Sequence, residues 1–94
     1  MAKGGAITLV ENASAAGSAV SWPGGRGVFM AEATFGGGTV TLQTQSPNGT
    51  WVDVENTALT AAGTAVFYLG PGPVRANIAT ATAVYAYAHV VNDV

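Results

Sequence analysis

The sequence predicts an all-β protein, an antiparallel β-sandwich or jelly roll of about eight strands. Thirteen glycines and four prolines divide the 94 residues into short apolar runs, a spacing typical of the strands and turns of sandwiches and barrels. Val, Thr and aromatic residues fill these runs, as a half-buried pleated surface prefers. Outside one short alanine-rich stretch, no segment keeps a helical period for three turns.

The eight strands follow from apolar or alternating runs that are bounded by turn residues. They are expected at residues 6–10, 19–22, 27–35, 39–45, 51–54, 65–69, 74–78 and 84–91. Alternation in the third strand puts Phe29 and Phe35 on one face. We expect residues 1–94 to form a single β-sandwich domain in which residues 1–5 are a flexible N-terminal arm.

Glycine and proline clusters predict how the first strands connect. The three glycines at residues 36–38 predict a hairpin between the third and fourth strands. Residues 46–50 (SPNGT) predict a second hairpin, because proline presets φ and glycine tolerates the left-handed conformation. The strands within residues 27–54 should therefore form a three-stranded meander.

The second half of the chain contains one ambiguous segment and one clear corner. Residues 58–62 could form a single helical turn, capped by Thr57 and ended by Gly63. Residues 70–73 (GPGP) predict a rigid corner with few hydrogen-bond donors. The last strand then has two distinct faces. One carries Val84, Ala86, Ala88 and Val90, and the other carries Tyr85, Tyr87, His89 and Val91.

The large apolar side chains at inward positions define the expected core. These residues are Phe29, Phe35, Leu42, Trp51 and Phe67. Trp51 directly follows a turn, so it could instead stack on a sugar or on a partner.

The low charge is the most informative feature of the composition. Charged residues make up 9% of the chain and hydrophobic residues 49%, with a net charge of −2, whereas an average soluble domain has roughly 25% charged residues. Large exposed apolar patches are scarce on monomers, so we expect copies of the chain or a partner to cover much of the surface. The alternative is an ordinary neutral sandwich with Ser, Thr, Asn and Gln on its surface.

The composition also excludes several classes of partner. Lys3, Arg26 and Arg75 are the only basic residues, too few for the basic stripe that nucleic-acid binding requires. The chain has no cysteine, which rules out disulfides and thiolate metal sites. No apolar stretch approaches the length of a membrane span. We therefore expect neither a nucleic-acid nor a membrane partner.

The sequence offers no group of residues suited to catalysis. His89 is the only histidine, and no nucleophile or orienting carboxylate accompanies it in the sequence. Asp53 and Glu55 alternate on one strand and could bind a cation or act as acid and base, but two solvated charges on an exposed face are the commoner arrangement. We expect no enzyme activity, no metal and no cofactor.

The last strand carries the best candidates for contact with another protein. Tyr85, Tyr87 and His89 share one face, and tyrosine suits an interface because it combines a large contact area with a polar end. We predict that these three residues face a partner, with Arg75 as a polar anchor. The alternative is that the tyrosine face is the core and the alanine face is outside.

A series of motifs resembles a group of small all-β virion proteins encoded by tailed bacteriophages. The motifs are residues 27–29 (GVF), 35–37 (FGG), 40–43 (VTLQ), 46–49 (SPNG), 51–54 (WVDV), 59–61 (LTA) and 67–76 (FYLGPGPVRA). The resemblance implies a structural role in the particle, most simply capsid decoration or cementing. The major capsid protein and copies of the chain itself, as a dimer or trimer, would be its partners. The protein would be made in the host cytoplasm and located on the capsid surface of the virion.

Two alternative functions stay open. Residues 42–51 (LQTQSPNGTW) also resemble the core hairpin of galactose-binding-like jelly rolls, a fold likeness that does not fix a ligand. That likeness would suit a carbohydrate-binding module on a tail fibre or other host-recognition device. A head–tail joining component is the second alternative, and it would form a ring instead of coating a shell.

Overall fold

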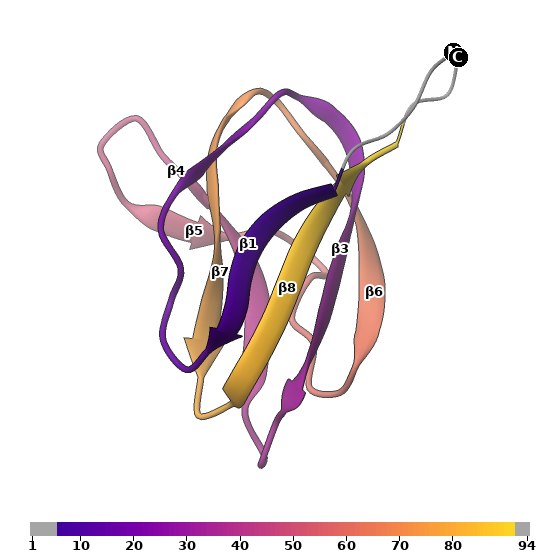
Figure 1. Ribbon diagram of the computed structural model, residues 1–94. Helices are drawn as coiled ribbons and strands as arrows, with labels where there is room; N and C mark the ends of the chain where they lie inside the picture. The colour runs from indigo at the N-terminus through magenta and orange to yellow at the C-terminus, as the bar shows by residue number, and fades with distance from the viewer. Residues whose placement is uncertain (1–5, 92–94) are drawn as a thin grey trace.

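The computed structural model describes residues 6–91 as two four-stranded antiparallel sheets around one core, consistent with a β-sandwich (Figure 1). Sheet A has the order β1-β8-β3-β6, and sheet B has the order β2-β7-β4-β5. The strands are β1 (Ala6–Ala13), β2 (Val20–Trp22), β3 (Gly25–Thr34), β4 (Thr39–Gln45), β5 (Trp51–Asp53), β6 (Gly63–Leu69), β7 (Gly72–Ala79) and β8 (Thr82–Val90). The prediction of an all-β fold with eight strands is confirmed.

The described residues contain no helix that is long and apolar enough to cross a membrane. The N-terminal arm expected at residues 1–5 lies outside the part of the chain that the structure describes.

The chain pairs with itself as one long hairpin whose midpoint is the turn between β4 and β5. β4 pairs with β5, β3 with β6, β2 with β7 and β1 with β8, all antiparallel. Two further pairings, β3 with β8 and β4 with β7, join these hairpins within each sheet. As a result, every link between consecutive strands except the β4–β5 turn passes from one sheet to the other.

The connection between β3 and β4 is not the expected hairpin. These strands belong to different sheets, so the three-stranded meander predicted for residues 27–54 is wrong. The glycines at residues 36–38 carry the chain between the sheets, and Gly38 N donates a hydrogen bond to Phe35 O (2.7 Å). Alternation reveals which face of a strand is buried but not which strands lie beside it. Here β6 and β8 pair with the two edges of β3, so no edge is left for β4.

The hairpin of β4 and β5 is present as predicted. Gln45 lies opposite Trp51, and the turn is closed by a hydrogen bond from Ser46 N to Thr50 O (2.8 Å). Gly49 in this turn has a φ of 89°, which a residue without Cβ adopts at little cost.

Phe29 fills the inner face of sheet A because its cross-strand neighbours are small. It is fully buried and lies opposite Ala65 of β6 and Ala88 of β8. A methyl group on either side leaves room for the ring to pack at the density of a protein interior. The other buried residues of the core are Leu9, Val10, Trp22, Ala31, Val40, Leu42, Phe67, Val74, Ala76, Ala81, Val84 and Ala86.

Trp22 joins the two sheets, although it was not among the predicted core residues. It lies on the three-residue strand β2 of sheet B, and its ring centroid is 4.8 Å from that of Phe67 in sheet A. Gly27 of β3 lies opposite Phe67 of β6. The missing side chain of Gly27 provides the space in which these two rings meet.

The predicted core is correct for three of its five residues. Phe29, Leu42 and Phe67 are buried in the core. Phe35 is half-buried and packs against the same cluster. Trp51 lies outside this core, where it contacts Arg75, so the prediction that it is a core residue is wrong.

The ambiguous segment at residues 58–62 does not form the helical turn that its sequence allowed. The chain instead runs back beside β4, where Leu59 forms an isolated antiparallel bridge with Val40. The backbone groups of these two residues exchange hydrogen bonds of 2.8 and 2.9 Å. Five residues form one turn at most, and helix nucleation is costly, so the unpaired edge of β4 offers the better hydrogen-bond partners.

Between β5 and the bridge at Leu59, the side chain of Thr57 holds the chain beside β4 by hydrogen bonds. Its hydroxyl accepts a hydrogen bond from Leu42 N (3.2 Å) and donates one to Val54 O (2.7 Å). The residue is completely buried. Just before it, Asn56 takes a left-handed φ of 64°, a conformation that asparagine tolerates better than most residues. The hydroxyl thus replaces a backbone partner where the chain leaves the ladder.

We expect Gly27→Ala to lower the free energy of unfolding by about 1–3 kcal/mol, because overpacking displaces well-packed rings. A Cβ at this position would lie 2.5 Å from Trp22 Cη2 and 2.6 Å from Phe67 Cζ. Gly70 is the matched control, since a Cβ there would meet no atom within 4 Å. Urea unfolding of both variants measures the difference, and equal costs for the two would contradict the packing argument.

Thr57→Val should cost about 1–3 kcal/mol, because the isosteric side chain leaves buried backbone groups without their hydroxyl partner. Thr60 is exposed in the same segment, and Thr60→Val should change stability by less than about 0.5 kcal/mol. Denaturant unfolding checks both values. Wild-type stability in the Thr57 variant would mean that the Leu42 N–H finds another acceptor.

Candidate functional site

The outer face of sheet A is largely apolar and aromatic. Its side chains align in rows across the strands: His89 lies opposite Val28, which lies opposite Val66. In the next row Tyr87 lies opposite Met30. We call this surface the aromatic face. It consists of Val28, Met30, Val66, Tyr68, Tyr85, Tyr87 and His89.

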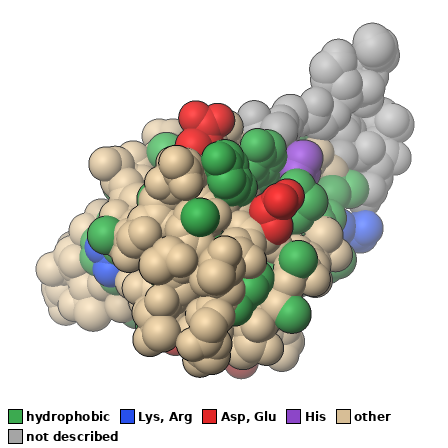
Figure 2. Space-filling model, turned by 60° about the horizontal axis from the view of Figure 1, so that its bottom comes forward, with side chains coloured by type: hydrophobic (Ala, Val, Ile, Leu, Met, Phe, Trp, Pro, Cys, Tyr) green, Lys and Arg blue, Asp and Glu red, His purple; other side chains and the backbone are tan. Residues whose placement is uncertain are grey.

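The aromatic face is unusually accessible for apolar side chains. Tyr68, Val66 and Tyr85 keep 77%, 65% and 39% of their surface exposed. Tyr87 and His89 are half-buried and stack on each other, with ring centroids 6.0 Å apart and an interplanar angle of 23°. Figure 2 shows hydrophobic side chains beside the single histidine, with acidic side chains between them. Two charged residues lie on the same outer face, Arg26 opposite Tyr68 and Glu32 opposite Tyr85. Such preordered rings lose little conformational entropy when another surface covers them.

The structure places Tyr85, Tyr87 and His89 outside the core, on the face that the sequence predicted. The alternating residues Ala86 and Ala88 are fully buried. The alternative arrangement, with the tyrosines inside, is therefore wrong. Whether these three residues face a partner is a separate question that their placement leaves as a prediction.

Val66 and Tyr68 belong to the same surface and were missed by the sequence analysis. Phe67 between them is buried, so alternation along β6 turns both neighbours outward. The signal was present but hidden, because all five residues at positions 65–69 are apolar or aromatic and no polar residue marks the outer face.

Arg75 lies on the other side of the molecule, on the outer face of sheet B. Gln43 of β4 lies opposite both Asp53 of β5 and Arg75 of β7. Arg75 Nε donates a hydrogen bond to Gln43 Oε1 (2.8 Å), and Gln43 Nε2 donates one to Asp53 Oδ1 (2.8 Å). Arg75 is thus not brought together with the tyrosines, and it could anchor only a partner that reaches the opposite face.

Trp51 belongs to this polar group and not to the core. The guanidinium carbon Cζ of Arg75 lies 4.5 Å from the centroid of the Trp51 ring, within the range of a cation–π contact. Trp51 is two residues from Asp53 on the same strand, so both side chains point outward. The tryptophan therefore covers the outside of sheet B, which explains why it is only half-buried.

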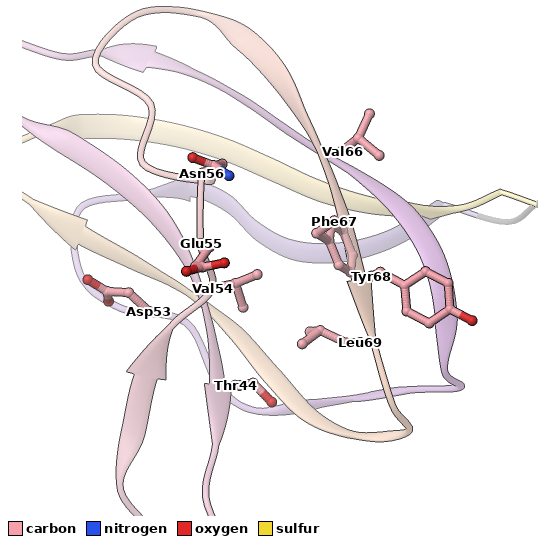
Figure 3. Close-up of a pocket in the computed structure, with 9 residues that line it drawn as sticks. All are labelled: Thr44, Asp53, Val54, Glu55, Asn56, Val66, Phe67, Tyr68 and Leu69. Atoms are coloured by element: carbon pink, nitrogen blue, oxygen red, sulfur yellow. The ribbon is translucent and has the colours of Figure 1, made fainter.

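A pocket of about 420 Å³ opens beside β6. Its lining residues are Thr44, Asp53, Val54, Glu55, Asn56, Val66, Phe67, Tyr68 and Leu69. Phe67 and Leu69 point towards the segment that carries Val54, whereas the Tyr68 ring points away from it (Figure 3). The pocket thus has an apolar floor and an acidic rim.

The acidic pair considered in the sequence analysis lies at that rim. Asp53 and Glu55 are both exposed, and the Asp53 carboxylate already accepts the hydrogen bond from Gln43. Within residues 6–91, no three His, Cys, Asp or Glu side chains lie close enough together to hold a metal ion. The arrangement is that of two solvated charges.

No protein-family model matches the chain, and no curated protein or solved structure shows significant similarity to it.

The contact between Trp51 and Arg75 should be measurable as a coupling of about 0.5–1 kcal/mol in a double-mutant cycle of Trp51→Ala and Arg75→Ala. Thermal or urea unfolding of the four proteins gives the coupling. A second cycle that pairs Trp51→Ala with Arg26→Ala is the control, because Arg26 lies on β3 of sheet A. Strictly additive effects in the first cycle would show that the ring and the guanidinium do not interact energetically.

Proposed function

We propose that the two-sheet fold is a jelly roll. Strands from the two arms of the long hairpin alternate in both sheets, as β1-β8-β3-β6 and β2-β7-β4-β5. A hairpin of eight strands that wraps around a common core produces this alternation. Jelly rolls occur in viral capsid and lectin domains, so the fold supports more than one function.

We propose that the protein is a structural component of a tailed-phage particle, most simply a capsid decoration or cement protein. The aromatic face carries the proposal, because it gathers exposed apolar and aromatic side chains on one sheet of a chain with only 9% charged residues. Tyrosine and methionine are enriched in protein interfaces, and charged residues are depleted from interface cores. The motifs shared with small virion proteins supply the phage context.

A protein of this kind would act through repeated contacts. Each copy would lie across a joint between capsid subunits and bury part of its aromatic face there. A contact made by one small domain would be weak, but many copies on one shell act together through multivalency. The shell would then resist internal pressure without any one contact being strong.

A carbohydrate-binding module is the alternative with less support. Sugar sites commonly use an exposed aromatic platform, but Arg75 covers one face of Trp51. The Tyr68 ring turns away from the pocket (Figure 3). A head–tail joining role, the other alternative, would require a ring of copies, which negative-stain electron microscopy would detect.

The test is co-sedimentation with shells assembled from the major capsid protein of the same genome. The wild-type protein should bind to saturation and raise the temperature at which the shells break open. Tyr87→Lys should weaken binding at least about tenfold, because interface tyrosines often contribute more than 1.4 kcal/mol. Ser21→Lys is the matched control, since Ser21 is exposed on β2 in sheet B.

Wild-type protein that stays in the supernatant at saturating concentration would overturn the capsid role. Binding to a glycan array in that case would favour the carbohydrate-binding alternative. Equal weakening of shell binding by Ser21→Lys and Tyr87→Lys would contradict the assignment of the contact to the aromatic face.

A further inference from the structure

The strand β6 forms a free edge of sheet A. Within residues 6–91 it pairs only with β3, and it is the outermost strand on that side of the sheet (Figure 1). The backbone N–H and C=O groups on its other side have no strand partner in this part of the chain. Such an edge is a template for pairing with another chain, and proteins usually protect it.

The other three sheet edges carry such protection. β1 has two register shifts against β8, between Thr8 and Val10 and between Val10 and Ala13, and such irregularities disrupt regular pairing. β2 and β5 are only three residues long, with Pro23 directly after β2 and the charged Asp53 at the end of β5. Short strands, proline and charge all discourage edge-to-edge association.

By contrast, β6 is long, regular and uncharged. Its seven residues, GTAVFYL, pair with β3 without any register shift. It contains no proline and no charged residue. It also carries Tyr68 and Val66, the two most exposed large hydrophobic side chains of the described residues. β6 therefore combines an open ladder with exposed apolar surface.

We propose that two copies of the chain pair through β6, antiparallel and around a two-fold axis at Val66. In this register Val66 lies opposite its own copy, and Thr64 lies opposite Tyr68. On the inner side of the strand, Ala65 lies opposite Phe67, and at the ends Gly63 lies opposite Leu69. Thus each large side chain faces a small or β-branched one, and no like charges meet across the axis.

On the inner side of the strand, the intramolecular partner of β6 follows the same size rule, whereas on the outer side Arg26 lies opposite Tyr68. In the β3–β6 pair, Phe29 lies opposite Ala65 and Phe67 lies opposite Gly27. Because the reverse of the β6 sequence is complementary to β6 itself, a second copy fits this edge better than an arbitrary strand would. This self-complementarity identifies the occupant as another copy of the chain.

The dimer would contain one continuous eight-stranded sheet. Its outer side would join the aromatic faces of both copies, since Val66 and Tyr68 lie at the seam. Asp53 and Glu55 belong to the segment on the sheet B side of the pocket (Figure 3), and packed sheets are about 10 Å apart. The carboxylates would therefore line a groove beside the strand contact and stay out of the contact itself.

The first test is sedimentation equilibrium of the intact chain over a wide concentration range. The wild-type protein should show a reversible monomer–dimer equilibrium, and Val66→Lys should raise the dimer dissociation constant at least tenfold by placing two cations at the axis. Val52→Lys is the control, because Val52 is 48% exposed on the edge strand β5. Thermal melts verify that both variants fold, as expected for exposed positions.

The second test determines the register of the β6–β6 pair by cross-linking, and it does not require a variant that weakens the dimer. The chain has no cysteine, so Val66→Cys introduces a single thiol that a short bismaleimide should link to its own copy. Thr64→Cys alone should link poorly, but a mixture of Thr64→Cys and Tyr68→Cys should yield the linked heterodimer. Val52→Cys should stay unlinked.

A wild-type chain that is monomeric at the highest concentration would overturn the proposal, as would equal effects of Val66→Lys and Val52→Lys. If Thr64→Cys cross-linked as efficiently alone as in the mixture with Tyr68→Cys, the register that places Val66 on the two-fold axis would be excluded. The proposal does not rest on the capsid role. If the protein dimerises but does not bind capsid shells, only the proposed function is overturned. If a strictly monomeric chain binds the shells, only the dimer is overturned.

Discussion

The placement of glycine and alanine opposite aromatic rings is the constraint on which this fold depends. Phe29 requires the small neighbours Ala65 and Ala88, and Phe67 meets Trp22 over the bare backbone of Gly27. The chain has no cysteine and therefore no disulfide to compensate for poor packing. The rings also set the separation of the sheets, because Trp22 from sheet B contacts Phe67 from sheet A. Each small residue therefore affects the packing of neighbouring strands and of the facing sheet as well as its own strand.

The same alternation that buries these rings determines what each sheet presents outside, and the two outer faces differ in kind. On sheet B, Arg75, Gln43, Asp53 and Trp51 satisfy one another through two hydrogen bonds and a cation–π contact. On sheet A, most outward positions carry rings and aliphatic groups, of which Val66, Tyr68 and Tyr85 remain exposed, and Arg26 and Glu32 are the charged residues beside them. Polar side chains that already pair with one another gain little from a partner, whereas exposed apolar surface gains from being covered. The asymmetry indicates which side of the molecule is open to association.

The sequence predicted the positions and buried faces of the strands well, because a period of two is a local signal. Of the strand neighbours it predicted only one pair correctly, the hairpin of β4 and β5. β3 and β4 are joined by three glycines, yet they belong to different sheets because β6 and β8 take both edges of β3. Residues 58–62 showed helical propensity that the open edge of β4 overrides. For the candidate surface, Tyr85, Tyr87 and His89 were placed correctly, but Arg75 was grouped with them because its partners Gln43 and Trp51 are distant in sequence.

The two proposed kinds of association would use perpendicular directions and would not compete. Strand pairing at β6 would extend sheet A within its own plane, whereas a contact through the aromatic face would approach the sheet from outside. Pairing would bring two aromatic faces into one surface with its seam at Val66 and Tyr68, so dimer formation would enlarge the docking area instead of consuming it. A partner that touches both copies would bind with the gain of two linked contacts. Self-association would then raise the affinity for a second protein without any change in the contact residues.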